Sequence, residues 1–373
     1  MRIFKKVDKV SEVAYFINKK KFKNILIVTG VNSFKYFNYK NSFLDEIGNK
    51  SYFIFYNKSH LYNEYKNLIV LIKLINKYNP DVILAIGGGT VIDLAKLANA
   101  LCFHKNIKKK ILNNRIQFDL KKKCNLIAIP TTAGSGSEVT KFSVLYVNGK
   151  KYSIENSIII PDFFFLIPSI LRHVPIKIRV TSGFDSIVQS IESLFSRESN
   201  KNSVRYSLIS IRYSFKSFLA YALGSNRKID FSNVLLASHY SGKAINIAKT
   251  NGPHAFSYFF TTNFGIAHGN AVVLFFLNFI KFYYANINNC NVDFNLKSRF
   301  NLLMKTTRTK NILDFIKYFN SLIIKTKINV NLKTFRIDID KEFNHFLKYL
   351  NIERLNNCPI SLSIKDIKNI VLN

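Results

Sequence analysis

The 373-residue sequence has no tryptophan, two methionines, seven prolines and four cysteines, and it is poor in acidic residues. The cysteines form no Cys-x-x-Cys pair, which argues against a zinc framework or a disulfide scaffold. The N-terminal segment lacks the apolar core of a signal peptide. The most apolar stretch, residues 271–280, is much shorter than the roughly 18 apolar residues that a membrane span needs. We therefore expect a cytoplasmic protein without a membrane partner.

The shortage of acidic residues leaves a net charge of +33, from 55 lysines and arginines against 22 aspartates and glutamates. A nucleic-acid-binding protein is one explanation of this charge, and a coding bias toward lysine, asparagine, isoleucine, phenylalanine and tyrosine is the other. Lysines gather only in short clusters, and none of these lies in a recognisable nucleic-acid module. The clusters are Lys19–Lys21, Lys108–Lys110 and Lys121–Lys123. We expect no nucleic-acid partner, although the charge would favour an anionic substrate.

Hydrophobic residues make up 48% of the chain, and its length suggests two domains. In the first part, short apolar runs alternate with helical patterns such as Leu61–Tyr78. Strands that alternate with helices predict an α/β domain with a doubly wound, mostly parallel sheet. The predicted strands are Asn24–Thr29, Tyr52–Tyr56, Asp81–Ile86 and Asn125–Ile129.

Beyond Pro168, long amphipathic segments replace the strand-like runs, which is typical of an all-helical domain. We place the boundary near residue 172, so that the α/β domain covers residues 1–172 and the helical domain covers residues 173–373. The predicted helical segments are Ser182–Ser196, Ser203–Leu223, Val234–Lys249, Gly269–Ala285 and Thr309–Ile323.

Two loops follow predicted strands and are rich in small residues. Gly87-Gly88-Gly89 opens a helix, where glycines allow a close approach of the backbone or a positive φ, and where the helix N-terminus attracts a phosphate. The pattern is not Gly-x-Gly-x-x-Gly, so a plain tight turn is the alternative. The second loop, residues 130–140, carries hydroxyls and glycines and has an ordinary polar loop as its alternative. Together they indicate a nucleotide site, because ligands bind at the carboxyl ends of strands in open α/β sheets.

A possible metal site lies in the helical part. Asp185 and Gln189 are four residues apart on a predicted helix and therefore share one face. His254 and His268 lie in a segment that is too apolar for a surface loop. A carboxylate with imidazoles suits a divalent metal, although a single buried histidine is more often structural.

Four segments resemble the iron-containing (group III) alcohol dehydrogenase family in order and spacing, over about residues 81 to 274. They are GGGTVIDLAK, PTTAGSGSEVT, GFDSIVQSIES and PHAFSYFFTTNFGIAHGNAVVL. The resemblance implies an NAD(P)-dependent alcohol dehydrogenase (EC 1.1.1.-) with a divalent metal, Fe²⁺ or Zn²⁺. It also implies a small aldehyde or alcohol as substrate and assembly as a homo-oligomer. The α/β domain would then bind the dinucleotide, and the helical domain would bind the metal and carry catalysis.

The resemblance also assigns individual residues. The cofactor residues are Gly87, Gly88 and Gly89 at the pyrophosphate, with Asp93, Thr131, Thr132, Ser135 and Lys151 around the cofactor. The metal ligands are Asp185, Gln189, His254 and His268, converging between the two domains. His254, as a ligand, and Tyr258, as a candidate proton donor, are the catalytic residues, and a ribose-linked water chain is the other candidate donor.

Two predicted site positions depart from the family pattern, and the family's common Asp-Pro before the second domain appears here as Ile167-Pro168. Gln189 stands where the family usually has histidine, and an amide oxygen is a neutral and weaker ligand. Tyr258 stands where many members carry a second histidine. The glutamine, with its flanking segments, resembles the branch that contains phosphonoacetaldehyde reductases, which form 2-hydroxyethylphosphonate. Lys249 would meet the phosphonate in that reading, or else lie at the surface.

The stretch after the first predicted strand, Val28–Ser33, has no carboxylate that would hold an adenosine ribose. We therefore expect NADPH to be tolerated with a slight preference, with Ser33 donating to the 2′-phosphate. The alternatives are a general or glycerol-type dehydrogenase, a dehydroquinate-synthase-like lyase, a non-catalytic nucleotide-binding relic, and, on charge alone, a nucleic-acid-binding protein.

Overall fold

The computed structural model describes residues 3–6, 9–39, 42–57, 62–113 and 121–372. The chain divides into two compact units, Met1–Val174 and Pro175–Asn373. Within the described ranges, no helix has the length and apolar character needed to cross a membrane.

The first unit contains a six-stranded sheet in the order β1-β8-β5-β4-β2-β3, and every neighbouring pair of strands is parallel. This confirms the predicted doubly wound sheet, and the predicted strands correspond to β2, β3, β4 and β5 within a residue or two at each end. The strands β1 and β8 were not predicted. The bounds are β1 Ile3–Lys6, β2 Asn24–Thr29, β3 Ser51–Tyr56, β4 Val82–Gly87, β5 Asn125–Pro130 and β8 Phe163–Leu166.

Helices cover both faces of this sheet. Residues of α1 (Ser11–Lys19), α2 (Val31–Phe37) and α3 (Ser42–Ile47) share a buried core with alternate residues of the strands, such as Ile27 and Leu84. On the other face, α4 (Tyr65–Tyr78) packs on α5 (Gly89–Leu101), and α5 packs on β4 and β5. Nearly the whole of α5 is buried, which agrees with its apolar sequence.

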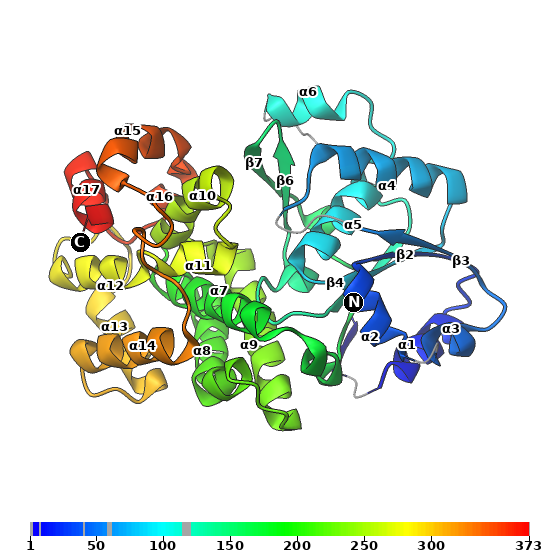
Figure 1. The fold of residues 1–373 in the computed structure, drawn as a ribbon, viewed down its shortest axis with the longest axis horizontal. Coiled ribbons are helices and arrows are strands. Elements are labelled where there is room, and N and C mark those ends of the chain that lie inside the picture. The colour runs from blue at the N-terminus through cyan, green and yellow to red at the C-terminus, as the bar shows by residue number, and fades with distance from the viewer. Residues whose placement is uncertain (1–2, 7–8, 40–41, 58–61, 114–120, 373) are drawn as a thin grey trace. The chain divides into compact units, whose positions relative to one another are not determined.

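An antiparallel hairpin of β6 (Phe142–Val147) and β7 (Lys150–Glu155) stands outside the main sheet, beside α5 (Figure 1). The predicted pattern of strands and helices did not include it. The short helical turn η2 (Ser137–Val139) connects β5 to this hairpin. Helix α6 and the turns η3 and η4 complete the unit, with bounds Ile107–Leu112, Ser157–Ile159 and Pro168–His173.

The second unit is helical, and none of its described residues lies in a strand, which confirms the predicted all-helical part. Its core is a cluster of phenylalanines, and the Phe256 ring contacts those of Phe275, Phe279 and Phe346 at centroid distances of 5.6, 4.8 and 4.9 Å. The helices are α7 Ile176–Phe195, α8 Lys201–Ala222, α9 Lys228–Ala248, α10 Gly252–Phe264, α11 His268–Val273, α12 Phe276–Ala285, α13 Leu296–Thr307, α14 Ile312–Thr326, α15 Ile339–Tyr349, α16 Ile352–Asn356 and α17 Ile364–Leu372.

One segment that was predicted as a single helix is broken into two in the structure. The segment Gly269–Ala285 forms two helices, α11 and α12, which are separated at Leu274 and Phe275. Phe275 has a φ of −116° and a ψ of 1°, outside the helical region. The residues on both sides of the break are apolar and largely buried, so hydrophobic periodicity gives no sign of it.

Candidate metal centre and cofactor loops

Three of the predicted metal ligands come together in the second unit. Asp185 lies on α7, His254 on α10, and His268 is the first residue of α11. The Asp185 Oδ1 atom lies 3.3 Å from His254 Nε2 and 3.8 Å from His268 Nε2. The three ligand atoms all lie within 4.8 Å of one another.

This donor set fits a divalent cation. Nitrogen and oxygen ligands at about 2.1 Å from one ion, in tetrahedral arrangement, lie about 3.4 Å apart, close to the distances between Asp185 and the two histidines. A carboxylate supplies the negative charge, and imidazole nitrogens suit zinc or ferrous iron. Asp185 and His254 are buried, and His268 is partly exposed, so solvent reaches the cluster at His268.

Two glycines let the helices approach closely enough to form the cluster. A Cβ atom on Gly269, next to His268, would overlap the backbone carbonyl of Thr181 on α7. A Cβ atom on Gly252, at the start of α10, would overlap the ring of Phe279. Since neither backbone carbonyl nor packed ring has room to move, larger residues at these glycines would push His268 and His254 away from Asp185.

A buried glutamate that sequence reasoning missed orients His254. Glu192 on α7 accepts a hydrogen bond from His254 Nδ1 and further bonds from the backbone N–H groups of Asn251, at 3.0 Å, and of His254, at 3.1 Å. A carboxylate can only accept at Nδ1, so Nδ1 carries a proton and Nε2 faces Asp185. The available signal was position, because Glu192 lies seven residues after Asp185 and therefore on the same helix face.

The charge around His254 favours a cation at Nε2. Burial lowers the pKa of His254, but the carboxylates of Glu192 and Asp185 outweigh this effect and raise the pKa to about 9. The same two carboxylates that favour a proton on His254 would favour a metal cation at Nε2, and metal binding would compete with that proton.

Gln189 and Tyr258 lie near these ligands in the fold. Gln189 is buried on α7, one helical turn after Asp185. Tyr258 is partly exposed on α10, one turn after His254. The fourth-ligand role of Gln189 and the proton-donor role of Tyr258 stay predictions.

In the first unit, the two small-residue loops pack against each other at the carboxyl ends of β4 and β5. The N–H of Thr131 donates to the carbonyl of Gly87 at 3.0 Å. Ser33, in the first turn of α2 directly after β2, joins them, with its Oγ 3.1 Å from Thr131 Oγ1. The structure therefore brings together residues from three strand ends, as expected for ligand sites in parallel sheets. Gly88 caps α5, whose first N–H groups have no partner within the helix.

Of the two uses expected for Gly87, Gly88 and Gly89, positive φ is not found, because none of them is among the residues with positive φ. They provide space instead. A Cβ on Gly87 would overlap Val91, while one on Gly88 would lie 3.0 Å from Thr132 Oγ1 and one on Gly89 2.7 Å from Ser135 Oγ. The positive φ of this region is at Gly136, with a φ of 62°.

Asp93 and Lys151 occupy different surroundings. The Asp93 carboxylate accepts hydrogen bonds from Ser137 Oγ and, at 2.9 Å, from the N–H of Val144, so it faces the second loop and the hairpin. Lys151 lies on β7 opposite Tyr146 of β6 and is partly buried. Their predicted places around the cofactor stay predictions.

Lys249 is engaged with carboxylates. Its Nζ lies 2.8 Å from Glu353 Oε1 and 3.3 Å from Glu198 Oε1. These ion pairs do not support a contact between Lys249 and a phosphonate. They favour the other reading, in which Lys249 lies at the surface, here with a partly buried ammonium.

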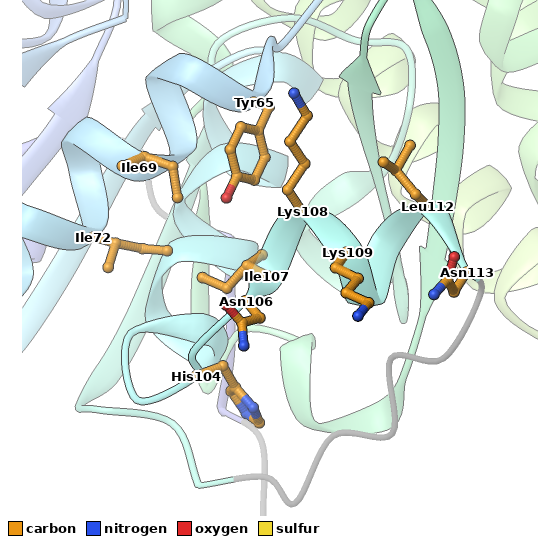
Figure 2. Close-up of a pocket in the computed structure, with 10 residues that line it drawn as sticks. All are labelled: Tyr65, Ile69, Ile72, His104, Asn106, Ile107, Lys108, Lys109, Leu112 and Asn113. Carbon is orange, nitrogen blue, oxygen red and sulfur yellow. The ribbon is translucent and has the colours of Figure 1, made fainter.

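One pocket of the first unit is lined by residues other than the predicted site residues. It lies between α4 and α6, has a volume of about 610 Å³, and Figure 2 shows Tyr65 beside Lys108 in it. None of the predicted site residues lines it, so its size carries no argument for the chemistry. Its lining consists of Tyr65, Ile69, Ile72, His104, Asn106, Ile107, Lys108, Lys109, Leu112 and Asn113.

Family models cover nearly the whole chain. The model described as "Iron-containing alcohol dehydrogenase" matches residues 1–168, and the one described as "Fe-containing alcohol dehydrogenase family, C-terminal" matches residues 179–372. The chain belongs to the iron-containing alcohol dehydrogenase family.

Two curated relatives match about half of the chain, over about half of their own length. Long-chain-alcohol dehydrogenase 1 of Geobacillus thermodenitrificans is 34% identical over 200 residues, which are 52% of this chain and 50% of that protein. Phosphonoacetaldehyde reductase of Streptomyces viridochromogenes is 28% identical over 212 residues, 55% of this chain and 54% of that protein. Sulfoacetaldehyde reductase of Bifidobacterium kashiwanohense, solved with NAD⁺, shares the fold with a TM-score of 0.86 at 21% identity, over 100% of this chain and 96% of that chain.

Proposed function

We propose that this protein is an oxidoreductase that transfers a hydride between NAD(P)H and a small aldehyde or alcohol. The observation that carries this proposal is the cluster of Asp185, His254 and His268, with ligand atoms within 4.8 Å of one another. Family membership supports the reaction type. Under this proposal, residues 1–172 are the dinucleotide-binding domain and residues 173–373 the metal-binding and catalytic domain.

Asp185, His254 and His268 would hold the metal, with Gln189 as the fourth ligand. When bound, the metal supplies Lewis-acid polarisation of the aldehyde oxygen and stabilises the charge of the alkoxide. Glu192 holds the Nδ1 proton of His254 and thereby keeps Nε2 available as a ligand. Tyr258, one turn after His254, is the candidate that gives the product its proton.

The cofactor would lie on the two loops of the first unit. Gly87, Gly88 and Gly89 let Val91, Thr132 and Ser135 pack closely around this turn, and the N-terminus of α5 would offer the pyrophosphate N–H donors and a positive dipole. The cofactor carries the hydride chemistry, and the protein contributes orientation. Ser33, beside Thr131, offers a hydroxyl and no negative charge, so a 2′-phosphate meets no repulsion from these two residues.

For the substrate, we propose an aldehyde of the phosphonoacetaldehyde type, reduced to 2-hydroxyethylphosphonate. The support is the similarity to the phosphonoacetaldehyde reductase at 28% identity and the glutamine at position 189. The net charge of +33 suits an anionic substrate. A general alcohol dehydrogenase is the second candidate, favoured by the 34% identity to the long-chain-alcohol dehydrogenase.

A panel of aldehydes distinguishes these candidates. The protein would be stripped of metal with a chelator and reloaded with Fe²⁺ or Zn²⁺. It would then be assayed with NADH and NADPH on phosphonoacetaldehyde, an unsubstituted short aldehyde and a long-chain aldehyde. We expect metal-dependent oxidation of the cofactor and the highest kcat/KM with phosphonoacetaldehyde. Highest kcat/KM with an uncharged aldehyde would select the general dehydrogenase, and absence of both metal binding and turnover would leave a nucleotide-binding relic.

A further inference from the structure

Lys96 on α5 is a fully buried lysine, with none of its surface exposed. Its ammonium donates to the carbonyl of Ser137 at 3.1 Å, to Ser137 Oγ at 3.3 Å, to Thr140 Oγ1 at 3.2 Å and to the carbonyl of Phe142. All of these acceptors belong to the segment that leads from the second cofactor loop into β6. The ammonium also lies 3.7 Å from Asp93 Oδ1 on its own helix, so Lys96 ties that segment to α5.

The contacts continue from Lys96 to the first cofactor loop. The Ser137 hydroxyl donates a hydrogen bond to the Asp93 carboxylate, while the Ser137 N–H donates to Ser135 Oγ at 3.3 Å. Ser135 Oγ in turn lies close to Gly89, only 2.7 Å from the position that a Cβ atom on Gly89 would take. Lys96 is thus linked through Ser137 and Ser135 to the glycine that opens α5.

We propose that Lys96 is a positioning residue for the nicotinamide cofactor, because its ammonium holds Ser137, Thr140 and Phe142 against α5 and thereby keeps the end of the second cofactor loop in register with the first. This inference rests on the proposed function, since it assumes that both loops contact NAD(P)H. Lys96 itself is too deeply buried to touch the cofactor, so it acts through Ser137 and Ser135.

The Lys96 ammonium is kept in the protein interior against the effect of burial on its charge. Burial lowers the pKa of Lys96 to about 8, although Asp93 and Glu138, which are the carboxylates that face it, act in the opposite direction. The folded protein therefore binds this proton more weakly than the unfolded chain does, and the buried ammonium costs stability at neutral pH. An apolar side chain of the same length would avoid that cost but would leave the carbonyls of Ser137 and Phe142 without their donor.

The test compares Lys96→Met with Asn99→Ala in the full-length protein. Asn99 is a matched control, because it is buried one turn later on α5 and binds Cys124 at the opposite end of β5. NADH and NADPH affinity would be measured by fluorescence titration, and Zn²⁺ affinity by calorimetry. We expect Lys96→Met to weaken cofactor binding roughly tenfold and leave Zn²⁺ binding unchanged, whereas Asn99→Ala should change neither.

Hydrogen–deuterium exchange without cofactor supplies a readout that general destabilisation does not mimic. In Lys96→Met, the amides of residues 131–140 should exchange faster while those of α4 keep their wild-type rates. Should Lys96→Met fail to fold, Thr140→Val removes one acceptor of the ammonium, and we expect a smaller loss of cofactor affinity with the same local change in exchange.

The possible failures are distinguishable. If the wild-type protein binds neither NADH nor NADPH, the proposed function fails. If the wild type binds cofactor and the folded Lys96 or Thr140 variants bind it equally well, only the inference on Lys96 is overturned. Equal weakening by Asn99→Ala would also overturn it, since the effect would then report the stability of α5.

Discussion

The two candidate sites are built in different ways. In the second unit, side chains from α7, α10 and α11 provide the donors, with Asp185 and His254 buried and turned toward each other. In the first unit, backbone groups and hydroxyls at strand ends form the surface, and glycines make the room. The metal centre therefore depends on the identity of a few side chains, while the cofactor loops depend on how closely two segments approach. Single substitutions should abolish the first and only weaken the second.

The largest effect should come from Asp185→Ala. Asp185 is the carboxylate shared by His254 and His268, and its loss removes the negative charge that offsets a buried cation. We expect metal binding to fall below detection and activity with it, while NAD(P)H still binds to the first unit. His254→Ala and His268→Ala should each remove most activity. Elemental analysis measures the metal content, and fluorescence titration measures the affinity for NAD(P)H. An Asp185→Ala protein with full metal content would contradict the ligand assignment.

A smaller effect is expected from Glu192→Gln. The amide keeps the shape of the side chain but removes the charge that holds the Nδ1 proton of His254, so metal affinity should fall about 10- to 100-fold. Glu198→Gln is the control, because Glu198 is exposed and pairs with Lys249 instead. Calorimetric titration with Zn²⁺ measures the difference. Unchanged affinity in Glu192→Gln would mean that His254 is oriented by its helix alone.

A substitution in the cofactor loops should have a smaller effect than one in the metal centre, and it should change the preference between NADPH and NADH. We expect kcat/KM for NADPH to equal or slightly exceed that for NADH. Ser33→Asp should reverse this preference, because a carboxylate there would repel the 2′-phosphate and accept from the ribose hydroxyls of NADH. Steady-state kinetics with both cofactors measure the two kcat/KM values. A wild-type kcat/KM that favours NADH by about tenfold or more would reject the predicted preference for NADPH.

The smallest change is expected from Gln189→His. An imidazole at this position restores the ligand usual in the family, so metal affinity should stay the same or increase. Activity on the native substrate depends on how the bulkier ring places the aldehyde. Calorimetry with Fe²⁺ and Zn²⁺ under anaerobic conditions tests this, and a clear loss of affinity would place Gln189 outside the coordination sphere.

The sequence predicted the architecture well where a periodic pattern was complete. The strands β2, β4 and β5 are buried apolar runs before small-residue loops, and the helices α7 to α9 are long and amphipathic. It did not predict the β6–β7 hairpin, whose strands lie partly in a polar segment. It also predicted continuity between α11 and α12, because apolar residues on both sides of the break look alike at the level of periodicity.

The candidate site was predictable to a similar degree. Histidines and aspartate with suitable spacing indicated a metal, and the structure brings Asp185, His254 and His268 together. Glu192 was missed because a carboxylate on a helix is usually solvated, and only the tertiary contact with His254 shows its role. Gly87, Gly88 and Gly89 were linked to positive φ or a close approach of the backbone. In the fold, their lack of a side chain leaves space for Val91, Thr132 and Ser135. Such requirements depend on neighbours that are distant in sequence.

The most direct test of the metal centre in a cofactor-dependent reductase is a titration of the chelator-treated protein with Fe²⁺ or Zn²⁺. Aldehyde-dependent oxidation of NAD(P)H would be followed at each addition. The arrangement of Asp185, His254 and His268 around one position predicts a rate that rises linearly and levels off at about one ion per chain. A rate that is independent of added metal, or that keeps rising without an equivalence point, would contradict the account.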